Sequence, residues 1–220
     1  MGKFHQLELE EKTHVKTPDL EPTKVGLTMG EVIHHINKYK ADDAVLVTDV
    51  GQHQMIAWRY FNYKKTRTQV TSGGLGTMGF ALPAALGAQL HDYSRQVICV
   101  VGDGGIQMTI QELGTIMQTK APVKIVLLNN NFLGMVRQWQ QMFFDKRYSF
   151  TELDNPDFIK IAEAYSIKAQ KVSERGGLQE AIEDILIHDG QFFLEVVVEK
   201  EDNVFPMIAT GCSVEEVRLS

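Results

Sequence analysis

Two polar motifs in the middle of the chain could together hold a metal ion. Asp103 stands between glycines after the apolar run QVICVVG, and Asn130 closes the apolar run VKIVLLNN. Read as parallel strands joined by a right-handed helical crossover, both runs end at the same edge of a sheet, so the two side chains should face one crevice. A carboxylate and an amide oxygen are hard donors that suit Mg²⁺ and leave coordination positions for water and phosphate oxygens.

The glycines around Asp103 give a reason to expect an anion beside the metal. Gly104 and Gly105 have no side chains, so their N–H groups can come close to an anion at the start of the following helix. Either motif alone is more often an ordinary strand end followed by a turn. Their order and separation, with a strand before each and a helix between them, favour a metal-bridged phosphate site.

A third polar group follows an earlier apolar run, AVLVTDV at residues 44–50. Gly51 permits a tight turn there, and Gln52 and His53 should stand at the carboxyl end of that strand, where α/β sheets place ligands. On local grounds a surface histidine that caps a helix is an equally good interpretation of His53.

The glycine-rich turn in TSGGLGTMGFALPAALGAQL supports a competing hypothesis. Gly74, Gly76 and Gly79 satisfy G-x-G-x-x-G between a strand and a helix, and Asp103 follows at about the distance of a ribose-binding acid. A nicotinamide-dependent dehydrogenase is therefore an alternative. A ribose-binding acid, however, needs neither its own GDGG turn nor a pair of asparagines at the end of the next strand.

The elements around these motifs alternate between strands and helices. A helix should open at Thr28, where TMGE has capping-box spacing, and another at Asn155-Pro156, with proline in its first turn. Strand-like and helix-like runs then alternate to the end of the chain, for about six strands in all. We therefore predict one doubly wound α/β domain over residues 28–220, with a parallel sheet and helices on both faces, preceded by an extended lead-in over residues 1–27.

Composition excludes several classes of protein. The formal charge is −6 with no basic cluster, which gives no reason to expect nucleic acid or an anionic membrane as partner. The amino-terminal residues are charged and no apolar run approaches bilayer-spanning length, so we expect a cytoplasmic protein. Cys99 and Cys212 are too few for a disulfide framework or a zinc or iron–sulfur site.

Four segments resemble consecutive motifs of one enzyme family. TDVGQHQM, TSGGLGTMGFALPAALGAQ, GDGGIQMTIQEL and LLNNNFLGMVRQWQ are similar to the thiamine-diphosphate-binding domain of acetohydroxyacid synthases, also called acetolactate synthases. GDG and NN are typical of all thiamine-dependent enzymes, whereas GQHQM and GMVRQWQ single out this family. The resemblance covers roughly residues 28–212. It departs from the family at Gly105 and Ile106, where Ser and Phe are usual, and at Asn131-Phe132, where acidic or polar residues often follow.

The resemblance implies a role for individual residues. Mg²⁺ would be held by Asp103, Asn130 and the backbone of Phe132. The carbonyl of Gly76 would accept a hydrogen bond from the aminopyrimidine of the cofactor, Met78 would hold its bent form, and Met135 would lie against the thiazolium. Val136 and Trp139 would line the substrate channel. The implied cofactor-binding residues are Val50, Gly51, Gln52, His53, Gly76, Met78, Gly102, Asp103, Gly104, Gly105, Asn130, Gly134 and Met135.

The implied reaction joins two pyruvates to 2-acetolactate with loss of CO₂, or pyruvate with 2-oxobutyrate, in branched-chain amino acid biosynthesis. In the family the activating glutamate lies on a separate pyrimidine-binding domain, donated across a dimer, and a middle domain binds FAD. Nothing in this sequence resembles either domain. We therefore expect a carboxyl-terminal fragment or subunit that supplies no certain catalytic residue and is inactive alone. We also expect it to assemble as a homodimer or higher oligomer that can take a regulatory subunit.

Three alternatives stay open at this point. The chain could belong to another thiamine-dependent 2-oxoacid decarboxylase, it could be a Rossmann-type dinucleotide-binding domain, or it could be a non-catalytic binding or assembly module that kept the cofactor site.

Overall fold

A six-stranded, entirely parallel sheet organises the computed structural model, which describes residues 2–22 and 25–219. The strand order is β2-β1-β3-β4-β6-β5. The strands are β1 Val45–Thr48, β2 Gln69–Thr71, β3 Val97–Gly102, β4 Lys124–Asn129, β5 Lys168–Val172 and β6 Phe192–Val197, and a separate antiparallel pair comprises β7 Met207–Ile208 and β8 Val217–Arg218. The predicted doubly wound α/β fold is confirmed.

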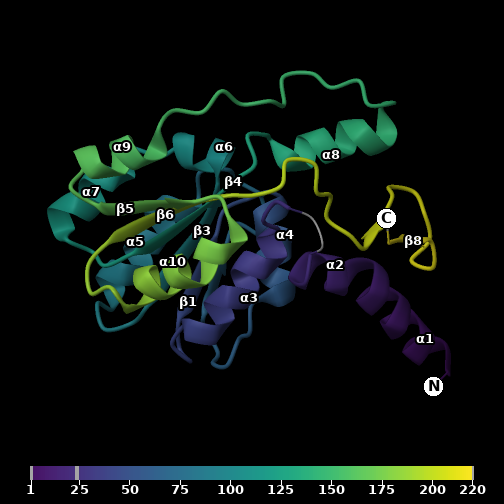
Figure 1. Cartoon of the computed structure of the whole chain (residues 1–220), viewed down its shortest axis with the longest axis horizontal. Coiled ribbons are helices and arrows are strands. Elements are labelled where there is room, and N and C mark those ends of the chain that lie inside the picture. The colour runs from purple at the N-terminus through teal and green to yellow at the C-terminus, as the bar shows by residue number, and fades with distance from the viewer. Residues whose placement is uncertain (1, 23–24, 220) are drawn as a thin grey trace.

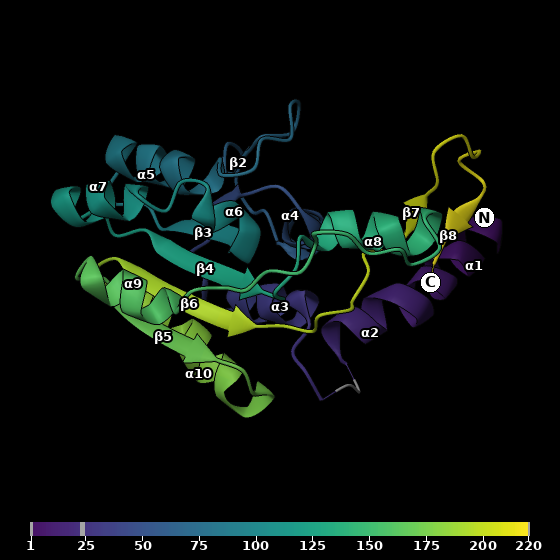
Figure 2. The ribbon, with the colours of Figure 1, turned by 90° about the horizontal axis from the view of Figure 1, so that it is seen from above.

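Helices cover both faces of the sheet, and each face has its own apolar core (Figures 1 and 2). One core includes residues of α3 Met29–Tyr39, α4 Gln52–Tyr60 and α10 Arg175–Ile187. The other includes residues of α5 Ala81–His91, α7 Glu112–Thr119 and α9 Phe158–Ala164. Every residue of β3 and β4 is buried, which explains why these strands are nearly continuous apolar runs rather than alternating ones.

Helix α3 begins as predicted at Thr28. The Thr28 hydroxyl accepts a hydrogen bond from the Glu31 N–H at 3.1 Å, and the Glu31 carboxylate accepts from the Thr28 N–H at 2.9 Å. This capping box satisfies two N–H groups that the first helical turn leaves unpaired.

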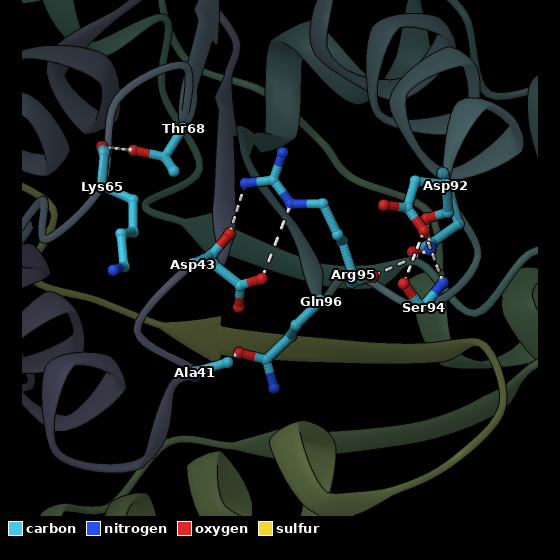
Figure 3. A network of polar contacts seen from close by, with 9 residues as sticks. Ala41, Asp43, Lys65, Thr68, Asp92, Ser94, Arg95 and Gln96 are labelled. Atoms are coloured by element: carbon cyan, nitrogen blue, oxygen red, sulfur yellow. Dashed lines mark hydrogen bonds and ion pairs between the residues drawn. The ribbon is translucent and has the colours of Figure 1, made fainter.

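Polar side chains form hydrogen bonds at the amino-terminal ends of β1 and β3 (Figure 3). Arg95 donates to the carbonyl of Asp43, and Gln96 accepts from the N–H of Ala41 at 2.9 Å. These contacts fix the starts of β1 and β3 relative to each other, and the carboxyl ends of the same strands are left for the site described below.

The predicted extended conformation of residues 1–27 is wrong for most of this segment. Helix α1 spans Gly2–Glu11, a π-helical turn η1 spans Lys12–Lys16 and α2 spans Thr17–Leu20; residues 1, 23 and 24 lie outside the described structure. Tertiary contacts hold η1 and α2, since Val15 is buried and the Tyr60 hydroxyl donates to Asp19 at 2.6 Å. Pro18 lies in the first turn of α2, a position that accepts proline.

Two other predicted elements differ in the structure. The connection between β3 and β4 contains two helices, α6 Asp103–Gln107 and α7, instead of one. Helix α9 begins at Phe158 and not at Pro156, because Asp157 is the residue that caps it, by accepting from the Lys160 N–H at 3.1 Å. Helix α8, Gly134–Phe143, follows β4.

Across the described residues, no helix is both long enough and apolar enough to cross a bilayer.

Candidate functional site

The carboxyl ends of β1, β3 and β4 surround one cavity. From β1 the chain continues to β2 on one side, whereas β3 lies on the other, and such a reversal of strand order opens a crevice where α/β proteins bind ligands. The predicted site residues that line the cavity are Val50, Gly51, Gln52, His53, Met78, Gly102, Asp103, Gly104, Gly105, Asn130, Phe132, Gly134, Met135 and Val136. Met29, Leu128 and Leu133 also line it and were not predicted.

Two predicted residues lie elsewhere. Gly76 occupies an exposed turn before α5 with φ +61°, and it is not among the residues that line the cavity. Trp139 is 38% exposed and lines a separate groove along α8, together with Val136, Gln140, Phe144 and Arg147. Val136 lines both the cavity and the groove, so the two are neighbours.

Asp103 is the acid among the residues that line the cavity, and it is 1% exposed. Its burial raises the pKa of the carboxyl to about 6, although hydrogen bonds from the Asn155 side chain and from backbone N–H groups, including that of Gly104, act in the opposite direction. A cation at this place would favour the ionised form. The carboxylate is therefore suited to pair with a metal ion.

Asn130 brings its amide to the same cavity. Its Oδ1 accepts from the Phe132 N–H at 3.2 Å, and its Nδ2 donates to Oε1 of Gln52 at 3.3 Å. The amide nitrogen thus faces Gln52, and the amide oxygen keeps a second lone pair for a ligand.

The donor set fits Mg²⁺ only if an outside ligand completes it. Within residues 2–22 and 25–219, no cluster of three or more His, Cys, Asp or Glu side chains could hold a metal ion by itself. One carboxylate, one amide oxygen and a backbone carbonyl are instead a set that Mg²⁺ shares with phosphate oxygens and water.

His53 stands against the glycines of the two strand ends. A Cβ built on Gly102 would lie 2.9 Å from the imidazole, so this position needs glycine. The ring is 5% exposed, and burial lowers the pKa of His53 to about 4, which leaves it neutral at pH 7. Its Nε2 atom is buried without a hydrogen-bond partner in the described part of the chain, as expected where a ligand atom would bind. The interpretation of His53 as a surface residue is wrong.

Asp49 has a structural role that the sequence did not reveal. Its Oδ1 accepts from the N–H of Val50 at 2.8 Å and of Gly79 at 3.1 Å, and its Oδ2 accepts from the Ala81 N–H at 2.9 Å. Asp49 therefore ties the end of β1 to the glycine turn before α5 and fixes Met78 at the cavity wall. The available signal was an acid in an otherwise apolar run directly before a turn.

A pair of buried glutamines joins the cavity to the carboxyl-terminal segment. Gln52 Nε2 donates to Gln138 Oε1 and to the carbonyl of Asp202, both at 2.9 Å. Gln138 Nε2 in turn donates to the carbonyl of Val204 at 3.0 Å. The first turn of α4, helix α8 and residues 202–204 are thus held as one unit.

The dinucleotide hypothesis fits this topology poorly. The turn that contains Gly74, Gly76 and Gly79 follows β2, which is an edge strand, whereas a dinucleotide fingerprint belongs at the central crevice. Asp103 begins its own short helix at that crevice.

Comparison with known proteins gives one consistent family. The acetolactate synthase isozyme 2 large subunit of Escherichia coli (strain K12) is 44% identical over 187 residues, which are 84% of this chain and 34% of the relative. The acetolactate synthase large subunit of Lactococcus lactis subsp. lactis (strain IL1403) is 44% identical over 198 residues, 90% of this chain and 34% of the relative. The chain thus spans about a third of the length of these relatives.

A solved structure and a family profile agree with these relatives. The thiamine diphosphate-dependent 4-hydroxybenzoylformate decarboxylase of Rhodococcus jostii RHA1 superposes with a TM-score of 0.75 at 27% identity, over 82% of this chain and 34% of that protein. The profile of the thiamine pyrophosphate enzyme C-terminal TPP binding domain matches residues 49–196, a range that begins directly after β1 and contains the ends of β3 and β4. Since this match extends over most of the chain, the chain belongs to the thiamine pyrophosphate enzymes and carries their carboxyl-terminal TPP binding domain.

Proposed function

We propose that residues 28–220 are the cofactor-binding domain of an acetolactate synthase, with Mg²⁺ bridging the diphosphate of the cofactor to the protein. The observation that carries this proposal is the single cavity that collects the GQHQ, GDGG and NN segments at the reversal of strand order. The 44% identity to acetolactate synthase large subunits supports this enzyme over other thiamine-dependent ones.

The residues of this chain bind and orient the cofactor. Asp103, Asn130 and the carbonyl of Phe132 hold Mg²⁺. Asp103 offers the anionic oxygen, Gly104 has no side chain to obstruct a phosphate, and the N–H group of Gly105 offers a donor to a phosphate oxygen at the start of α6. Bound thiamine diphosphate would supply the carbon acid and the electron sink for decarboxylation of a 2-oxoacid.

The neutral imidazole of His53 would turn its unpartnered Nε2 atom toward the diphosphate. Val50, Gly51 and Gln52 would complete the diphosphate cradle. Met78 and Met135 give the cavity apolar walls, which exclude water from the reacting carbon.

The complete enzyme would condense two pyruvates to 2-acetolactate, or pyruvate with 2-oxobutyrate, in branched-chain amino acid biosynthesis. Val136 and Trp139 would border the path of the second 2-oxoacid, in the groove beside the cavity. The activating glutamate and the FAD site would lie outside this chain. We also propose a cytoplasmic homodimer or higher oligomer that can take a regulatory subunit.

Removal of the metal-binding acid tests the proposal. Asp103→Ala should lower the affinity for Mg²⁺ and thiamine diphosphate at least ~10-fold, because it removes the anionic ligand. Calorimetric titration of the unaltered chain and of the variant gives both affinities. The control is Asp145→Ala, an aspartate whose side chain is 93% exposed on the surface. Equal affinity in the Asp103 variant, or binding of a nicotinamide dinucleotide instead, would contradict the assignment.

A second candidate is a simple 2-oxoacid decarboxylase, which the likeness to the Rhodococcus decarboxylase favours. The products separate the two, since a decarboxylase releases an aldehyde and CO₂, whereas an acetolactate synthase joins the remaining two-carbon unit to a second 2-oxoacid.

A further inference from the structure

Asn155 lies beside Asp103, although the sequence predicts only the start of a helix at this position. Its Nδ2 donates to Asp103 Oδ2 at 2.7 Å and to Asn129 Oδ1 at 3.2 Å. Its Oδ1 accepts from Gln107 Nε2 at 3.0 Å. Both amide hydrogens and the amide oxygen are therefore used. The reversed amide would place its oxygen against the Asp103 carboxylate, so only one orientation of the Asn155 side chain is favourable.

The partners of Asn155 belong to a longer polar chain. Asn129 Nδ2 donates to Glu195 Oε1 at 2.8 Å, and Lys171 Nζ contacts the same oxygen at 3.0 Å. Glu195 is 2% exposed, so this part of the network lies inside the protein. A continuous series of hydrogen bonds thus runs from β5 through β6 and β4 to the residue that follows β3. Asn129 thus anchors Asn155, which can in turn restrain the carboxylate of Asp103.

Asn155 comes from the segment between α8 and α9, and it reaches Asp103 across 52 positions of the chain. Asp103 lies in the short helix α6, next to glycines that allow backbone movement. The hydrogen bond from this distant segment limits rotation of the Asp103 carboxylate.

We propose that Asn155 is a positioning residue that orients the Asp103 carboxylate for Mg²⁺ and thereby sets the affinity of the metal site. This inference rests on the proposed function, because it takes Asp103 as the metal ligand. Hydrogen bonds that orient a ligand typically change metal affinity 10- to 100-fold when they are lost. Asn155 is not one of the residues proposed to hold the metal, and it is not among the residues that line the cavity.

The test measures binding rather than turnover. Calorimetric titration of the full chain with Mg²⁺ and thiamine diphosphate gives the dissociation constant, and thermal melts of the ligand-free chain report folding. Asn155→Ala should raise the dissociation constant about 10-fold. If Asn155→Ala does not fold, Asn155→Ser is the second variant; its shorter side chain also loses the amide donor, so the same rise is expected.

Asn37 provides a matched control. It is a half-buried asparagine on α3 whose Nδ2 donates to the Tyr60 carbonyl at 2.7 Å and whose Oδ1 accepts from the Asn62 N–H at 2.8 Å. Asn37→Ala should lower the melting temperature and leave the dissociation constant unchanged. A purely structural role for Asn155 would give the same pattern as Asn37.

A double-mutant cycle shows whether Asn155 acts through Asp103. In a chain that already carries Asp103→Ala, Asn155→Ala should cause no further loss of affinity, because the oriented group is gone. Equal losses in both backgrounds, or unchanged affinity in Asn155→Ala, would overturn this inference alone. If the unaltered chain showed no Mg²⁺-dependent binding of thiamine diphosphate, the proposed function and this inference would both fail.

Discussion

The carboxylate of Asp49 occupies the space where a side chain on residue 105 would stand. A Cβ built on Gly105 would lie 2.6 Å from Oδ1 of Asp49. Asp49 cannot easily turn away, because its two oxygens accept hydrogen bonds from three backbone N–H groups. The close approach of α6 to the end of β1 therefore depends on glycine. This contact explains why residue 105 of this chain is a glycine, although acetolactate synthases usually have a serine at this position.

Gly105→Ala should consequently destabilise the chain by about 1–3 kcal/mol, the usual effect of overpacking a tight site. Helix propensity alone would favour alanine by up to about 1 kcal/mol, so a net loss identifies the contact with Asp49. Urea unfolding measures the change. Gly176→Ala in α10 is the control, since a Cβ there meets nothing within 4 Å. Equal stability of the two alanine variants would contradict the role of Asp49.

Trp139→Leu should change substrate choice more than stability. The indole is 38% exposed in the groove along α8 and packs against Phe143, with ring centroids 4.8 Å apart. If the complete enzyme acts as proposed, a pocket contact of this kind would set discrimination between pyruvate and 2-oxobutyrate of about 1–3 kcal/mol. Competition between the two 2-oxoacids, followed by product analysis, measures the ratio.

The control for Trp139 is Trp58→Leu, which alters a tryptophan that is 42% exposed on α4. It should leave the product ratio unchanged. A loss of roughly 3 kcal/mol of stability in Trp139→Leu, with the ratio unaltered, would instead indicate a core residue.

Stability should depend on Lys124 at alkaline pH. This lysine is 4% exposed and donates to the carbonyls of His188 and Gly190. Burial lowers its pKa from 10.5 to about 8. Between about pH 8 and pH 10.5 the unfolded chain therefore binds more protons than the folded chain, and the free energy of unfolding contributed by Lys124 rises with pH.

Comparison with Lys124→Met isolates this contribution from other groups that titrate. The stability difference between the unaltered chain and the variant should shift in favour of lysine by at most about 1.4 kcal/mol per pH unit within that window. Urea unfolding at pH 7.5 and 9.5 tests it. Lys160→Met, at a side chain that is 80% exposed, should follow the unaltered chain. Parallel pH profiles for Lys124→Met and the unaltered chain would refute the prediction.

The chain alone should form no acetolactate. The activating glutamate is expected on a different domain, and the buried acids of this site are already engaged: Asp49 with backbone N–H groups and Asp103 with Asn155. Pyruvate, Mg²⁺, thiamine diphosphate and FAD are supplied to the purified chain and acetolactate is measured. In a second assay the pyrimidine and FAD domains are added in trans, as separate polypeptides. Activity only after mixing is the expected result, and turnover by the chain alone would contradict it.

The sequence by itself determined the sheet and most of the cavity wall. Long apolar runs separated by helix-length segments specify buried parallel strands, and crossovers of one hand bring their carboxyl ends together. For this reason Asp103 and Asn130 could be placed in one crevice from their positions after β3 and β4, whereas the position of His53 after β1 left a surface role equally open. The cap at Thr28 was predictable because it depends on residues three positions apart.

The tertiary structure decided which distant groups hold that wall in place. Asn155 reaches Asp103 across 52 positions, Gln52 meets Gln138 across 86, and Asp49 accepts from N–H groups 30 and 32 positions away. Periodicity reports that a residue is buried or turned outward, but it does not report its partner in another segment. Residues 2–20 likewise lack a periodic pattern of their own, and their later turns are held by the contacts that Glu11, Val15 and Asp19 make with the folded body.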